Sequence, residues 1–106
     1  MASALNDTTL ATTYAANAST LKTNFNAAFW VPEVGMYKDN TTNTTIFPQD
    51  ANSMAVLFGL ADDKAATISD NLVNNWGDFG PLPPELPDTV TPFISGYEVH
   101  FPSFLL

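Results

Sequence analysis

Two segments decide the fold, FPQDANS at residues 47–53 and PFISGYE at residues 92–98. Each lies where a loop turns into an apolar helix, and neither composition is what helix formation alone requires. The surrounding apolar residues recur at helical spacing in several stretches, which predicts an all-α fold. The two irregular segments therefore mark loop-to-helix junctions that need another explanation.

The first predicted helix begins after Asp7 or Thr8, because either side chain can accept hydrogen bonds from the free N–H groups of a first turn. Pro32 and Gly35 are expected to end it, since proline disfavours helical geometry at the preceding residue and glycine allows a turn. Its predicted apolar face recurs at steps of three and four residues and comprises Leu10, Tyr14, Ala18, Leu21, Phe25 and Ala28.

Two further helices are expected close together in the middle of the chain. One spans residues 51–60 and is expected to be buried on much of its circumference, through Met54, Leu57, Phe58 and either Ala51 or Ala55. The other is capped by Asp62, is closed by Gly77 in a left-handed conformation, and buries Ala65, Ile68, Leu72, Val73 and Trp76. Only a few residues separate the two helices, which predicts an antiparallel pair, the unit of bundles, solenoids and (α/α) barrels.

The remaining segments are expected to be loops, apart from a last helix that opens near Pro92. Residues 35–39 and 44–47 predict either a short hairpin or two extended arms around a polar tip. That tip carries two glycosylation acceptor patterns, at Asn40 and Asn43. No regular element is expected in the stretch from Gly77 to residue 92, which is rich in glycine and proline.

The bulk composition indicates a globular chain with an uncharged polar surface. Its 106 residues are 45% hydrophobic and only 13% charged, and three lysines without arginine leave a net charge of −8. Nucleic acid and anionic membranes are therefore not expected partners, and no apolar run is long enough for a membrane span. Cysteine is absent, which excludes disulfides and thiolate metal sites. Residues 1–7 lack the features of a secretion signal, so localisation stays open, with secretion considered for a parent protein.

Taken in order, residues 11–100 resemble the α-L-rhamnosidase-like six-hairpin glycosidases, most closely their fungal branch. The segments that carry the resemblance are Leu21-Lys22, Trp30, residues 35–40 (GMYKDN), residues 48–53 (PQDANS), residues 75–77 (NWG), Pro84-Glu85 and residues 92–98 (PFISGYE). Their order and spacing are more specific than any one motif. The resemblance implies that residues 1–106 form a single partial domain, a fragment of an (α/α)6 barrel.

The resemblance also implies inverting hydrolysis of terminal L-rhamnose, without a cofactor, by an intact parent protein. Inversion needs a protonated carboxylic acid and a carboxylate base on opposite faces of the sugar, roughly 6.5–9.5 Å apart. In the family these acids lie in an acidic motif upstream and a Trp-Glu segment downstream, and neither pattern occurs here. We therefore expect no catalytic residue, leave enzymatic activity open, and expect this fragment to be inactive. Five rim residues are predicted to contact substrate, namely Gln49, Asp50, Asn52, Ser95 and Glu98.

Structural alternatives exist for several of these residues. Asp50 also fits a helix N-cap, Glu98 fits a structural carboxylate near a helix start, and Trp76 is expected in the core although its face could stack on a sugar. His100 is the only histidine and is expected to be structural, so no metal site is predicted.

Two other functions remain open from the sequence, a non-catalytic glycan- or protein-binding module and a helical-hairpin scaffold for a partner protein. The apolar ending, Phe104 to Leu106, and helix faces left bare in a partial barrel further predict self-association.

Overall fold

The computed structural model describes residues 2–100 and consists mainly of helices, which confirms the all-α class. The α-helices are α1 (Thr8–Phe29), α2 (Gln49–Leu57), α3 (Ala65–Val73) and α4 (Pro92–His100). Short 3₁₀ helices, η1 (Ala2–Leu5) and η2 (Asp62–Lys64), precede α1 and α3. The chain's last residues, among them Phe104 to Leu106, lie outside the described part. No helix in residues 2–100 is both long and apolar enough to cross a bilayer.

Two small antiparallel ladders accompany the helices. β1 (Trp30–Val31) pairs with β2 (Met36–Tyr37), and β3 (Trp76–Gly77) pairs with β4 (Gly80–Pro81). The second ladder lies in the stretch where no regular element was predicted, so that prediction is wrong. The predicted arms around residues 40–45 are joined by one backbone hydrogen bond, from Asp39 N–H to Ile46 oxygen at 2.9 Å. β2 pairs instead with the residues that follow α1.

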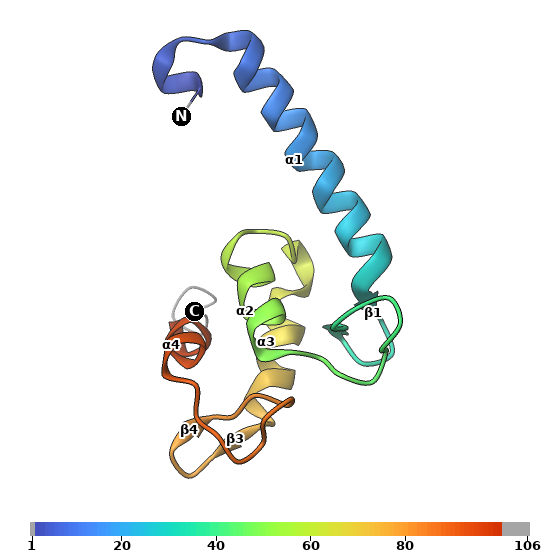
Figure 1. Cartoon of the computed structure of the whole chain (residues 1–106), viewed down its shortest axis with the longest axis vertical. Coiled ribbons are helices and arrows are strands. Elements are labelled where there is room, and N and C mark those ends of the chain that lie inside the picture. Colours follow the sequence, from blue (N-terminus) through green and yellow to red (C-terminus); the bar gives the residue numbers. More distant parts are fainter. Residues whose placement is uncertain (1, 101–106) are drawn as a thin grey trace.

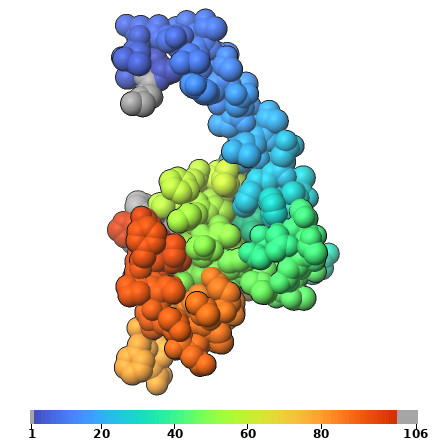
Figure 2. Space-filling view, in the orientation of Figure 1, coloured from blue at the N-terminus to red at the C-terminus, as the bar shows by residue number. Residues whose placement is uncertain are grey.

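Helix α1 begins as predicted and then departs from its predicted role. Asp7 is its N-cap, and the Asp7 carboxylate accepts the Leu10 N–H at 2.9 Å. None of its residues is buried, however, and Tyr14 and Leu21 are 59% and 65% exposed. Figure 1 shows why, because most of α1 projects away from the other helices and only its C-terminal end reaches them. Figure 2 shows the same projection in space-filling form, along the 49 Å long axis of the molecule.

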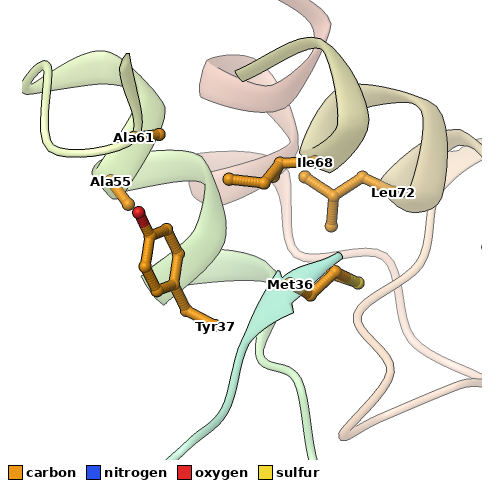
Figure 3. Packing of buried hydrophobic residues seen from close by; sticks show 6 residues of the cluster. All are labelled: Met36, Tyr37, Ala55, Ala61, Ile68 and Leu72. Carbon is orange, nitrogen blue, oxygen red and sulfur yellow. The ribbon is translucent and has the colours of Figure 1, made fainter. Parts of the chain in front are cut away.

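The core lies between α2, α3 and β2 (Figure 3). Its buried apolar members are Met36, Tyr37, Ala55, Ala61, Ile68 and Leu72. Phe25 and Phe29 at the end of α1 and Trp30 in β1 pack against this cluster, with the Phe25 ring 4.7 Å from the Tyr37 ring. The end of α1 is also held by a hydrogen bond from Tyr37 Oη to Asn26 Oδ1 at 2.7 Å.

The central helices run in opposite directions, as the short connection predicted (Figure 1). The predicted burial of α2 is wrong for Leu57 and Phe58, which are exposed, whereas Ala55 is buried as one alternative had it. The other buried residues of α2 are polar, namely Gln49, Asn52 and Ser53. The polar side of α2 faces inward because it meets hydrogen-bonding groups of β2 and α4.

The predicted ends of α3 also need correction. Asp62 does not cap α3, because it starts η2 and forms an ion pair with Lys22. Gly77 does not close the helix in a left-handed conformation, since α3 stops at Val73 and Gly77 lies in β3.

Candidate functional site

The site begins at the first residue of α2. Pro48 occupies the N-cap position and provides no capping hydrogen bond. The Gln49 N–H instead donates to Glu85 Oε2 at 3.3 Å, so a carboxylate from a distant loop faces the helix N-terminus. Asp50, for which the N-cap was one of two interpretations, is the second residue of α2 and is exposed. Its Oδ1 accepts the neighbouring Ala51 N–H at 2.7 Å.

The Gln49 side chain joins α2 to α4. It is only 1% exposed, and its Nε2 donates to Glu98 Oε2 at 2.6 Å and to Ser95 Oγ at 3.4 Å. Its Oε1 accepts a hydrogen bond from Thr91 Oγ1 at 2.9 Å. Ser95 and Glu98 lie three residues apart and therefore on the same side of α4. The amide of Gln49 thus has partners for both its donor and its acceptor atom inside the fold.

Glu98 continues this chain of hydrogen bonds to the β3–β4 hairpin. Its carboxylate is buried, with 4% of the residue exposed, and Oε1 accepts the Trp76 indole N–H at 2.6 Å. Both carboxylate oxygens are therefore occupied, one by Gln49 and one by Trp76. We call Gln49, Trp76, Thr91, Ser95 and Glu98 the Glu98 cluster.

A second contact fixes the hairpin against the same helix. Ser95 Oγ donates to the Pro81 carbonyl oxygen at 3.3 Å. Pro81 is the residue that opposes Trp76 in the β3–β4 ladder. Trp76 is thus positioned from two directions, through its own indole nitrogen and through its strand partner.

Trp76 is 40% exposed, so the expectation that it lies in the core is wrong. Helical spacing placed it on the stripe of Ile68 and Leu72, but the helix has already ended at Val73. The chain then enters β3, and the indole lies at the surface with only its nitrogen directed to a buried group.

Asn52 belongs to a different arrangement. It is fully buried, its Oδ1 accepts the Tyr37 N–H at 2.8 Å, and its Nδ2 donates to the carbonyl oxygens of Tyr37 and Pro48, each at 2.9 Å. The carboxamide therefore binds the backbone of β2 much as a neighbouring strand would. Next to it, Ser53 Oγ is buried and has no hydrogen-bond partner among the described residues.

Of the five residues predicted to contact substrate, the structure brings Gln49, Ser95 and Glu98 together. Asn52 binds the β2 backbone one turn along α2, and Asp50 lies on the solvent side of the same helix. Thr91 was not among the residues predicted from the sequence, and Trp76 was predicted to lie in the core. For Thr91 the only signal was its position before Pro92, because its partner Gln49 lies 42 residues away.

The site has no arrangement typical of a metal centre. Within residues 2–100, no group of three or more histidine, cysteine, aspartate or glutamate side chains is placed to hold a metal ion. The chemistry available is that of amides, hydroxyls, a buried carboxylate and an exposed indole. Such groups bind neutral polar ligands through hydrogen bonds and stacking.

Comparison with known families agrees with a site made of groups that bind neutral polar ligands. Residues 1–78 match the family model described as the bacterial α-L-rhamnosidase six-hairpin glycosidase domain. The match includes Gln49, Asp50, Asn52 and Trp76 and ends before α4. No curated protein matches the chain. Membership of the fungal branch stays a prediction. Because the family model covers most of the sequence, this chain belongs to the α-L-rhamnosidase six-hairpin glycosidase domain family.

Proposed function

We propose that this chain supplies part of the sugar-facing rim of a rhamnosidase-related glycosidase domain and that it does not cleave rhamnosides by itself. The family supports a carbohydrate substrate. The observation that carries the proposal is the occupation of both Glu98 oxygens by Trp76 and Gln49 inside the fold. Because this carboxylate is buried and each of its oxygens already binds a neighbour, we assign it the role of positioning those neighbours and not that of exchanging a proton with a substrate.

The glutamates support the second half of the proposal. Inverting hydrolysis uses two carboxyl groups roughly 6.5–9.5 Å apart on either side of the sugar. Glu33 is exposed in the turn between β1 and β2, and Glu85 Oε2 faces the N-terminus of α2. Glu98 is enclosed in the Glu98 cluster. None of these three positions suggests an acid and a base facing each other across a ligand.

The five predicted rim residues take two roles in this proposal. Asp50 contacts the sugar directly, because its carboxylate is exposed at the start of α2 and can accept hydrogen bonds from two hydroxyls. Gln49, Asn52, Ser95 and Glu98 hold the rim in shape, since their polar atoms bind partners within the fold. The domain itself is proposed to be one section of the six-hairpin barrel, spanning residues 1–106.

Two measurements on the purified chain test the proposal. Incubation with p-nitrophenyl α-L-rhamnopyranoside is expected to release no nitrophenol above the buffer rate. Titration with L-rhamnose, followed by NMR, is expected to show saturable binding that Asp50→Asn weakens about threefold or more. Asp70→Asn is the matched control, because Asp70 is an exposed aspartate on α3, and this variant should bind as the wild type does.

Two results would contradict the proposal. Hydrolysis that disappears in Glu98→Gln would show that the buried carboxylate takes part in chemistry. Equal affinity of Asp50→Asn and the wild type for L-rhamnose would remove Asp50 from the rim. Saturable binding without any turnover is the expected outcome, and it is equally what a non-catalytic glycan-binding module would give.

A further inference from the structure

We infer that the groove beside Trp76 is a subsite for a neutral pyranose ring, which stacks on the indole while its hydroxyls bind asparagine amides. The groove encloses about 280 Å³. Its lining comprises Asn74, Asn75, Trp76, Leu82, Pro83, Pro84 and Pro87. The inference takes only the class of ligand from the proposed function, and no residue of the groove is among the five predicted rim residues.

Trp76 presents an exposed aromatic ring in a fixed orientation. Trp76 is 40% exposed, yet its indole N–H is held at 2.6 Å by a carboxylate that is itself 4% exposed. Gln49 holds the other oxygen of that carboxylate, and Thr91 in turn holds Gln49. An exposed indole that is immobilised in this way loses little conformational entropy when a flat ligand binds to it.

Two asparagines line the same groove as Trp76. The carboxamides of Asn74 and Asn75 make no side-chain hydrogen bond to any residue in the range 2–100. Each carboxamide offers two donors and an acceptor, which matches neighbouring hydroxyls on a sugar ring. Prolines form much of the remaining wall, and their rings keep it rigid.

The net charge of the chain favours a neutral ligand. The chain carries a net charge of −8, so an anionic ligand such as a phosphate or a nucleic acid would be repelled. A neutral sugar is not repelled by this charge. An aromatic face for the C–H side of the ring, flanked by amides for its hydroxyls, is the combination that neutral sugars require.

The experiment uses the two tryptophans of the chain as separate reporters. Trp30→Phe leaves Trp76 alone, and its fluorescence is expected to change saturably on addition of L-rhamnose, with an affinity within twofold of the wild-type value. Trp76→Ala is expected to lower the affinity at least fivefold by NMR titration. Parallel titrations with D-glucose and D-galactose distinguish a rhamnose-selective subsite from a general pyranose subsite, and either result supports the groove.

Further variants keep the test valid if Trp76→Ala does not fold. Asn74→Ala changes an exposed residue and is expected to weaken binding about threefold, whereas Asn17→Ala, an exposed asparagine on α1, should have no effect. Glu98→Gln tests positioning, because it keeps the shape but opposes an amide donor to Gln49 or Trp76. It is expected to shift the indole N–H resonance of Trp76 and to weaken sugar binding, while the circular dichroism spectrum stays unchanged.

The inference is overturned if Trp76→Ala and Asn74→Ala bind every sugar as tightly as the wild type does. It also falls if the fluorescence of Trp76 in Trp30→Phe does not respond to bound sugar. If Asp50→Asn alone loses sugar binding, the proposed rim is supported and the inference about this groove is overturned. Turnover of the rhamnoside by the chain would contradict the proposed function alone, and a wild-type chain that binds none of the sugars would contradict both.

Discussion

Individual buried polar residues make the decisive long-range contacts of this fold. Gln49 and Asn52 are 1% and 0% exposed, and each binds a segment far from it in the sequence. That residues 47–53 are unusual could be predicted from the sequence, because an amide-rich start is not needed for a helix. The partners of Gln49 and Asn52 could not be predicted, because hydrogen bonds across 49 or 15 residues leave no periodic pattern in the sequence.

Tyr37 carries a prediction about pH. Burial, together with the smaller effect of the nearby Asp62 and Asp63 carboxylates, raises the pKa of its phenol from 10 to about 12. Between these two pKa values the Tyr37 phenol is therefore protonated in the folded state and ionised in the unfolded state. This contribution to stability is fully present below about pH 10 and is lost as the pH rises through about 12. A two-unit difference corresponds to at most about 2.7 kcal/mol.

The measurement compares urea unfolding of the wild type and Tyr37→Phe between about pH 8 and pH 11. At the lower pH the variant is expected to be less stable by about 1 kcal/mol, because it lacks the hydrogen bond to Asn26. As the pH rises, the wild type should lose stability faster, so the two values converge. If the free energies of unfolding of the two proteins change in parallel with pH, the Tyr37 phenol has the same pKa in the folded and unfolded states, which would contradict this prediction.

At the scale of elements, the starts of α1 and α4 were predicted correctly, since Asp7 and Pro92 are local signals. The incorrect predictions concern which face of a helix is buried and where a helix ends. Leu57 and Phe58 were assigned to the core from composition, but the polar side of α2 has the better partners in β2 and α4. The end of α3 at Val73 was missed, because Gly77 is the stronger stop signal and the helix was extended to it past Asn74 and Asn75.

The turn between β1 and β2 provides a test at this scale, because it packs directly on α3. Gly35 has φ +73°, and a Cβ placed there would lie 2.7 Å from Thr67 Cγ2 and 2.8 Å from Asn71 Nδ2. Gly35→Ala is therefore expected to combine backbone strain of about 1–2 kcal/mol with a clash, for a total loss of about 3 kcal/mol or more. Thermal unfolding measures the change.

Gly59 is the matched control for this variant. It has a similar φ of +68°, but nothing lies within 4 Å of the added Cβ. Gly59→Ala should therefore cost only the backbone term, about 1–2 kcal/mol. Equal losses in the two variants would mean that the turn is not pressed against α3.

At the scale of the whole molecule, we propose that these helices are a section of a larger helical barrel. The family has six hairpins, and α1 here has no buried residue and no helix packed along most of its length (Figure 2). Further large apolar side chains face solvent, among them Phe58 and Phe93, each 70% exposed. The helical class followed from local periodicity. The exposure of α1 did not, because the pattern shows which face is apolar and not whether anything covers it.

Sedimentation velocity over increasing protein concentration tests this central claim most directly. We predict self-association that grows with concentration, because exposed apolar faces gain about 25 cal/mol per Å² when a second copy covers them. Tyr14→Glu with Leu21→Glu should reduce the association markedly, whereas Thr13→Glu with Thr20→Glu, which adds the same charge at the same spacing on the polar side of α1, should reduce it much less. A compact monomer whose sedimentation coefficient does not change with concentration would contradict the account.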